Sequence, residues 1–187
     1  VKGKSTSINA LVKAYTGLGE QIKAIDAAKL TEINKALSGG AYPVSAVLAN
    51  DAIMNVIKPG QHGSTFGGNP VAAAVAIAAL EVVNEEHLAQ NARKLGKKFR
   101  EVIGAYIKTS TIATLVRGRG LLNAVVINDT EESDTAWNIC MALSENGLLA
   151  KPTHGNIIRF APPLVMTEEQ LLECTTIIIN TLKQFEK

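Results

Sequence analysis

Three sets of side chains have types and spacings that suit chemistry. Lys35 stands just before the small-residue turn Ser38-Gly39-Gly40. Ser64 and Thr65 stand just before Gly67-Gly68-Asn69-Pro70, and Arg159 lies in an otherwise apolar run. An amine, a pair of hydroxyls and a guanidinium together suggest a covalent aldehyde site, a phosphate site and a carboxylate clamp.

Lys35 is the candidate nucleophile. A lysine held in a pocket, with its pKa lowered by desolvation or nearby cations, can form a Schiff base with an aldehyde cofactor. The alternative is a solvated lysine at the end of a helix, as most lysines are exposed.

Ser64 and Thr65 are candidate phosphate ligands. Hydroxyl donors, glycines that permit close backbone approach and free amides at a helix start all favour an anion. The stretch is not a Walker loop, because the Gly-Lys-Ser/Thr ending is missing. The alternative is an ordinary capped loop ahead of a helix.

Arg159 is the candidate carboxylate ligand. It lies within Ile157–Ala161, where a charge needs a partner. Its planar fork suits bidentate binding of a substrate carboxylate. A structural salt bridge is the alternative.

Composition narrows the class of protein. The chain has 187 residues, of which 47% are hydrophobic and 19% charged, with a net charge of +2. This balance indicates a globular protein that binds neither nucleic acid nor a membrane surface. Cys140 and Cys174 both fall in helical patterns, and the three histidines lack metal-ligand spacing. We therefore expect reduced thiols, no metal, and a cytoplasmic location.

The expected secondary structure changes character along the chain. In the first half we expect a helix over 8–30 with a break at Gly17 and Gly19, and then a buried strand over 42–49. A helical turn over 51–57 follows, and a helix over 71–84 begins at Asn69-Pro70. The second half begins with a helix over 86–107, followed by strands over 111–116 and 121–127 that a turn or bulge at 117–120 joins. A helix over 134–146 then ends at Gly147, and strands over 148–151 and 157–161 follow, with a loop at 152–156 between them. The last helix starts with the capping box of Thr167 and Gln170 and ends near Phe185.

These elements suggest three parts and an α/β to α+β fold class. Residues 1–34 form a helical segment, residues 35–85 hold a strand followed by a long helix, and residues 86–187 form a small α+β domain. A soft boundary falls along the helix that ends near Asn84.

From Lys35 to its end, the sequence resembles the ornithine aminotransferase branch of the class III, fold-type I aminotransferases that depend on pyridoxal phosphate. About four fifths of the chain is covered. The resemblance implies that residues 35–85 are the end of the large, cofactor-binding domain with its connecting helix, and that residues 86–187 are the small C-terminal domain. The stretches that carry the resemblance are Lys35–Gly40, Tyr42–Leu48, Lys58-Pro59-Gly60, His62–Pro70, Ala76–Val82, Val116–Leu122, Gly147–Gly155 and Arg159–Leu164. Gly67–Pro70 is shared across class III, whereas Lys151–Gly155 and Arg159–Leu164 point more narrowly to the ornithine branch.

The resemblance implies roles for the candidate residues. Lys35 would be the Schiff-base lysine and proton shuttle, Ser64 and Thr65 would hold the phosphate of pyridoxal 5′-phosphate across a dimer interface, and Arg159 would bind a substrate carboxylate. The reaction would move the δ-amino group of ornithine to 2-oxoglutarate, giving glutamate semialdehyde and glutamate. The partners would be a second copy of the chain, an amino acid and a 2-oxo acid, and the compartment in a eukaryote would be the mitochondrial matrix.

The segment before Lys35 departs from the family pattern and leaves alternatives open. Only 34 residues precede Lys35, so most of the family's large domain is absent, and Val12 stands where the family has the aspartate that pairs with the pyridine nitrogen. One alternative is a catalytically incompetent fragment that only folds or dimerises. Others are a different class III enzyme, such as an acetylornithine aminotransferase, or a binding module whose loop holds another anion.

Overall fold

The computed structural model describes residues 42–44, 46, 49–61 and 63–186. The chain divides into two compact units, Val1–Glu86 and His87–Lys187, and each is described by itself. The helix expected over 8–30 lies outside the described residues. In the part that is described, no helix is both long and apolar enough to cross a bilayer.

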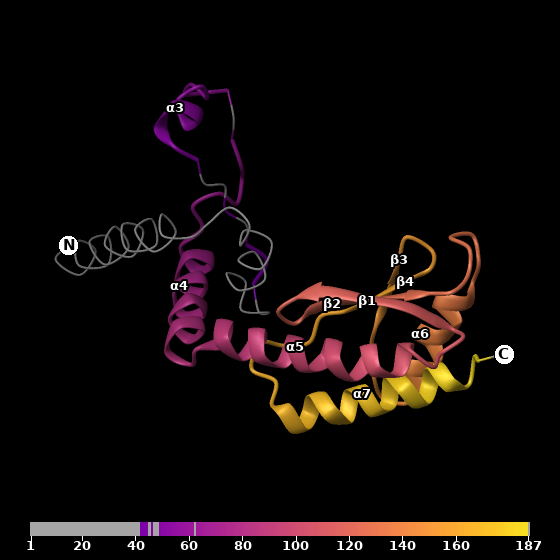
Figure 1. The fold of residues 1–187 in the computed structure, drawn as a ribbon. Helices are drawn as coiled ribbons and strands as arrows, with labels where there is room; N and C mark the ends of the chain where they lie inside the picture. Colours follow the sequence, from indigo (N-terminus) through magenta and orange to yellow (C-terminus); the bar gives the residue numbers. More distant parts are fainter. Residues whose placement is uncertain (1–41, 45, 47–48, 62, 187) are drawn as a thin grey trace. The chain divides into compact units, whose positions relative to one another are not determined.

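The first unit contains a short helix and a long one (Figure 1). Helix α3, Asp51–Met54, is capped by the side chain of Asn50. Helix α4, Pro70–Glu85, starts where Asn69-Pro70 predicts, and the Asn69 side chain accepts hydrogen bonds from the amides of Val71 and Ala72. Ala76 and Leu80 on α4 are buried against Val44 and Ala46.

The strand expected over 42–49 is wrong for the residues that can be described. Tyr42, Pro43, Val44, Ala46 and Ala49 have no strand geometry. A strand forms its ladder with a neighbouring strand, and the described residues of this unit include no other strand. Val44 and Ala46 instead pack against α4.

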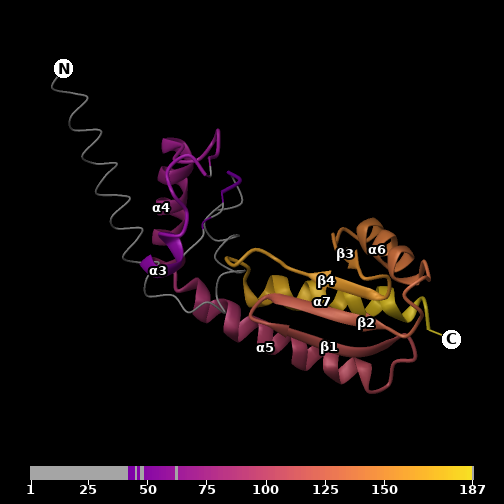
Figure 2. The same cartoon turned by 90° about the horizontal axis from the view of Figure 1, so that it is seen from above.

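The second unit is an antiparallel sheet with helices on one face (Figures 1 and 2). Its strands are β1 (Ala113–Arg119), β2 (Leu122–Ile127), β3 (Lys151–Thr153) and β4 (Ile157–Phe160), arranged in the order β1-β2-β4-β3. Helices α5 (Leu88–Ile107), α6 (Thr135–Glu145) and α7 (Glu168–Lys183) supply the other half of the core. The α+β fold expected for this part of the chain is confirmed.

The core lies between the sheet and the helices because each strand alternates. On β2, Asn123, Val125 and Ile127 are buried, while the residues between them are not. Leu95, Phe99 and Ile103, which are spaced along one face of α5, belong to the same core cluster. Phe99 and Phe160 join α5 to β4 with ring centroids 5.7 Å apart. The opposite face of the sheet is not crossed by any described helix of this unit (Figure 2).

Two strand boundaries differ from the sequence-based expectation. The stretch 117–120 is not a turn or bulge, because β1 continues to Arg119 and only Gly120 and Leu121 form the loop. Gly120 has φ +54°, as two-residue hairpin loops require. The strand expected over 148–151 forms instead at Lys151–Thr153, where it pairs with β4, so 152–156 is only partly a loop. In both cases pairing with another strand sets the ends.

Candidate cofactor and substrate site

The loop before α4 presents hydroxyls and amides to solvent. Ser64 and Thr65 are exposed, and neither hydroxyl has a hydrogen-bond partner within the described ranges. The loop is closed by two backbone bonds, from the Gly67 amide to the Ser64 carbonyl at 3.2 Å and from the Asn69 amide to the Phe66 carbonyl at 3.3 Å. An oxyanion could accept hydrogen bonds from both hydroxyls without displacing a protein partner.

The first amides of α4 are not free, contrary to expectation. The Asn69 side-chain oxygen accepts from Val71 at 2.9 Å and from Ala72 at 3.3 Å, and the Asn69 carbonyl accepts from Ala73. Pro70 has no amide hydrogen to offer. The helix cap therefore uses the donors that the sequence assigned to an anion, and the hydroxyls carry that role alone.

A side-chain contact joins Tyr42 to the start of α4. The Asn69 Nδ2 donates to the Tyr42 hydroxyl at 3.1 Å. This bond holds Tyr42 beside the start of α4. Lys35 itself lies outside the described residues, so its role as the Schiff-base lysine stays a prediction.

Arg159 lies in the second unit, on the face of the sheet away from the helices. It is exposed, between buried Ile158 and buried Phe160 on β4. In register, it pairs with Ala124 on β2 and with Lys151 on β3. No acidic group of the described chain forms an ion pair with it, so the salt-bridge alternative gains no support there. Its guanidinium is available to a carboxylate.

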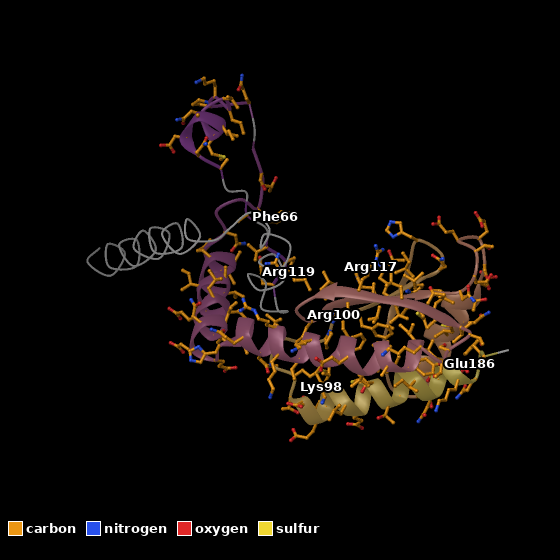
Figure 3. All side chains as sticks on the ribbon, viewed as in Figure 1. Phe66, Lys98, Arg100, Arg117, Arg119 and Glu186 are labelled. Atoms are coloured by element: carbon orange, nitrogen blue, oxygen red, sulfur yellow. The ribbon has the colours of Figure 1, made fainter. Side chains whose placement is uncertain are left out.

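Sequence reasoning missed a network that holds the β1–β2 hairpin on α5 (Figure 3). Arg100 Nη1 donates to the Gly120 carbonyl at 3.2 Å and to Asn123 Oδ1 at 2.8 Å. Asn123 Nδ2 also donates to the Gly120 carbonyl, at 3.2 Å. Gly96 lies so close that a Cβ there would overlap that same carbonyl. The sequence does contain a clue to this network, because Arg100 and Gly96 lie one helical turn apart on the apolar side of α5.

The groups with shifted pKa values belong to the scaffold. Burial raises the pKa of the Cys140 thiol to about 11 and also raises that of Cys174. Desolvation, with a hydrogen bond to Glu186, raises the pKa of Tyr106 to about 12. A hydrogen bond to Lys94, 2.7 Å away, lowers the pKa of Glu168 and ties α5 to α7. Nowhere in the described ranges do three histidine, cysteine or acidic residues gather as metal ligands.

Comparison with protein families places this geometry in context. The model of the family described as aminotransferase class-III matches residues 23–182.

The chain belongs to the class-III aminotransferase family.

The matched span of this class-III chain includes Lys35, Ser64, Thr65 and Arg159. Mitochondrial ornithine aminotransferase of Rattus norvegicus is 57% identical over 153 residues, which are 82% of this chain and 34% of the relative. The chain thus spans about a third of the length of the curated relatives it matches. The expected resemblance to ornithine aminotransferases is confirmed.

Solved structures agree with the family on the fold. An acetylornithine aminotransferase from Elizabethkingia anophelis superposes with a TM-score of 0.75 and 68% identity, over 81% of this chain and 38% of that one. The ornithine aminotransferase from Toxoplasma gondii, with partial occupancy of PLP at its active site, superposes with a TM-score of 0.73 and 46% identity, over 80% and 35%. The expected fold class, the end of an aminotransferase large domain followed by a small α+β domain, is therefore confirmed.

Proposed function

We propose that this class-III chain is part of an enzyme that depends on pyridoxal 5′-phosphate and transfers the δ-amino group of ornithine to 2-oxoglutarate. The products are glutamate semialdehyde and glutamate. The observation that carries the proposal is the 57% identity to mitochondrial ornithine aminotransferase over 153 residues, together with a class-III match over residues 23–182 that contains all four candidate residues. Partial PLP occupancy in the Toxoplasma relative supports the choice of cofactor.

The phosphate end of the cofactor fits the loop at Ser64 and Thr65. Two exposed hydroxyls without described partners are a donor set for a phosphate. At Gly63 a Cβ would meet nothing within 4 Å, so the approach to the loop is open. Ser64 and Thr65 would hold the phosphate of a neighbouring subunit's cofactor, which makes a homodimer part of the proposal.

Lys35 and Arg159 would handle the reacting end. When bound, the cofactor supplies an electron sink for the amino acid's bonds. The Lys35 amine would hold the cofactor by its aldehyde group, and it would hold and move the proton at the carbon that bears the substrate's reacting amine. The Arg159 guanidinium would orient the substrate by pairing with a carboxylate.

A second substrate is favoured by one observation. The acetylornithine aminotransferase of Elizabethkingia anophelis is 68% identical to this chain. N-acetylornithine presents a δ-amino group but has a blocked α-amino group and no net positive charge. Ornithine is the primary proposal, since the rat enzyme that bears its name matches at 57% over a comparable share of the chain.

Covalent labelling tests the cofactor assignment. The purified protein is incubated with pyridoxal phosphate, reduced with borohydride, digested and mapped by mass. The pyridoxyl mass is expected on the peptide that contains Lys35, and Lys35→Ala should remove it while Lys29→Ala should not. A label spread evenly over exposed lysines would contradict the assignment.

A product assay tests the substrate. Glutamate formation from 2-oxoglutarate is measured with ornithine or with N-acetylornithine as donor. Ornithine is expected to give the higher kcat/KM, and a preference for N-acetylornithine would establish the second candidate. The cytoplasm is the proposed compartment, or the mitochondrial matrix if the protein is eukaryotic, as the name of the rat relative suggests.

A further inference from the structure

The face of the sheet away from the helices carries a row of basic residues. Only strand pairing brings these residues together. Arg117 on β1 pairs with Ala124 on β2, Ala124 pairs with Arg159 on β4, and Arg159 pairs with Lys151 on β3. All three basic residues are exposed. Directly paired residues of an antiparallel sheet point to the same face. Four strands therefore bring an Arg-Ala-Arg-Lys row together from positions 117, 124, 159 and 151.

The small side chain of Ala124 leaves space above the middle of this cationic row. Neighbouring strands are about 4.8 Å apart, so the backbones of Arg117 and Arg159 are roughly 10 Å apart with only a methyl group between them. Each guanidinium stands on three methylenes and can lean over that methyl group. The guanidinium groups of Arg117 and Arg159 can then reach one carboxylate from opposite sides. Figure 3 shows Arg117 on the side of the sheet away from α5 and α7.

An apolar row runs alongside the cationic row. Leu115, Val126 and Ile157 are register partners across β1, β2 and β4, followed by Thr153 on β3. Leu115 is 49% exposed although it is a large aliphatic residue. A short methylene chain could lie on this row while its charged end sits between the arginines. The pattern matches a small dicarboxylate.

The cationic row has no described counter-charge. None of its three members forms an ion pair among the described residues, and the strand positions that share its face include no aspartate or glutamate. Like charges placed directly opposite each other, as Lys151 and Arg159 are, destabilise a sheet. A bound anion would remove this repulsion.

We propose that Arg117 acts with Arg159 as a two-sided clamp for one carboxylate of a dicarboxylate substrate, seated over Ala124, and that Lys151 adds a third charge that selects a dianion. This inference rests on the proposed function, because it assigns the 2-oxo dicarboxylate of the reaction to this face of the sheet. It extends the carboxylate role from Arg159 to Arg117 and Lys151.

Binding of glutarate to the cofactor-free chain tests the clamp. Amide and arginine Nε resonances are followed by NMR at fixed ionic strength during titration with glutarate, butyrate or inorganic phosphate. Glutarate should shift the Nε signals of Arg117 and Arg159 and the amide of Ala124. Losing a charge-assisted hydrogen bond at an exposed site should weaken glutarate binding about fivefold in Arg117→Gln and in Arg159→Gln.

Two matched variants separate the clamp from general charge. Arg119→Gln removes the same charge from the same strand one register row away, and Arg93→Gln removes it from α5; both should keep glutarate affinity within about twofold. Lys151→Gln should reduce the preference for glutarate over butyrate. All spectra report whether each variant is folded.

Several results would overturn the clamp. They are an unchanged glutarate affinity in Arg117→Gln, an equal effect of Arg119→Gln, equal binding of butyrate, or phosphate binding as tightly as glutarate. Because no pyridoxal phosphate is present, failure of Lys35 labelling would leave this titration unaffected. A failed titration with successful labelling would overturn the clamp and leave the proposed function standing.

Discussion

Replacing Gly96 by alanine should destabilise the second unit, although helix propensity alone predicts the opposite. In the interior of a helix, alanine is better than glycine by about 1 kcal/mol. Gly96 lies in the middle of α5, and a Cβ there would overlap the Gly120 carbonyl in the β1–β2 loop. The hairpin must move away from the helix, which strains the bonds from Arg100 to that carbonyl and to Asn123 Oδ1.

The magnitude follows from these contacts. Overpacking a close contact costs about 1–3 kcal/mol, and weakening a charge-assisted hydrogen bond costs about 1.5–3 kcal/mol. Subtracting the propensity gain of about 1 kcal/mol, Gly96→Ala should lower the free energy of unfolding by about 1.5–5 kcal/mol. That is a large share of the 5–15 kcal/mol that typically stabilises a domain.

Gly104→Ala is the matched control on the same helix. A Cβ at Gly104 would meet only Val116 Cγ1, at 3.7 Å, which is ordinary contact. This variant should therefore gain about 0.5–1 kcal/mol from helix propensity. Urea unfolding followed by circular dichroism measures both, and amide shifts of Gly120 and Asn123 report the hairpin. A Gly96→Ala protein as stable as Gly104→Ala would refute the reasoning.

Three further predictions concern the scaffold. Thr167→Ala removes the oxygen that accepts from the Gln170 amide at the start of α7, so urea unfolding should show a loss of about 1 kcal/mol. Ile139→Ala opens a cavity at a side chain that is 0% exposed, and the same assay should show a loss of about 2–5 kcal/mol; a smaller loss would mean that α6 closes the gap. Burial raises the pKa of Cys140 from 9.0 to about 11, so the unfolded chain releases this proton first and the contribution of the neutral thiol is lost as pH rises from 9 through 11. The stability advantage of the parent over Cys140→Ala should accordingly shrink across that window, and an advantage that grows would contradict the sign.

Helix ends could be read from the sequence because their causes are local. Asn69 and Pro70 start α4, the capping box of Thr167 and Gln170 starts α7, and Gly147 with φ +82° follows α6. In each case the hydrogen bonds that decide the end join residues only a few positions apart. Two of these motifs, Asn69-Pro70 and Gly147, also lie in stretches that indicated the class-III family. Capping hydrogen bonds of this kind can form wherever the helix forms, whatever packs against it.

Strand ends and strand neighbours could not be read in the same way. The end of β1 at Arg119 and the place of β3 at Lys151–Thr153 depend on which residues face them across the sheet. The strand expected over 42–49 did not form in the described residues, which offer it no partner strand. The structure also shows that the Asn69 cap occupies the first α4 amides, which leaves the hydroxyls of Ser64 and Thr65 for an anion.

The sequence by itself determined which residues could do chemistry, and the tertiary structure decided which of them meet. Lys35, Ser64, Thr65 and Arg159 stand out by type and by neighbours along the chain. The register of four strands alone puts Arg117 and Lys151 in one row with Arg159. A one-residue slip would turn such a side chain to the other face. This alignment is non-local, since it arises from backbone hydrogen bonds between segments up to about forty residues apart.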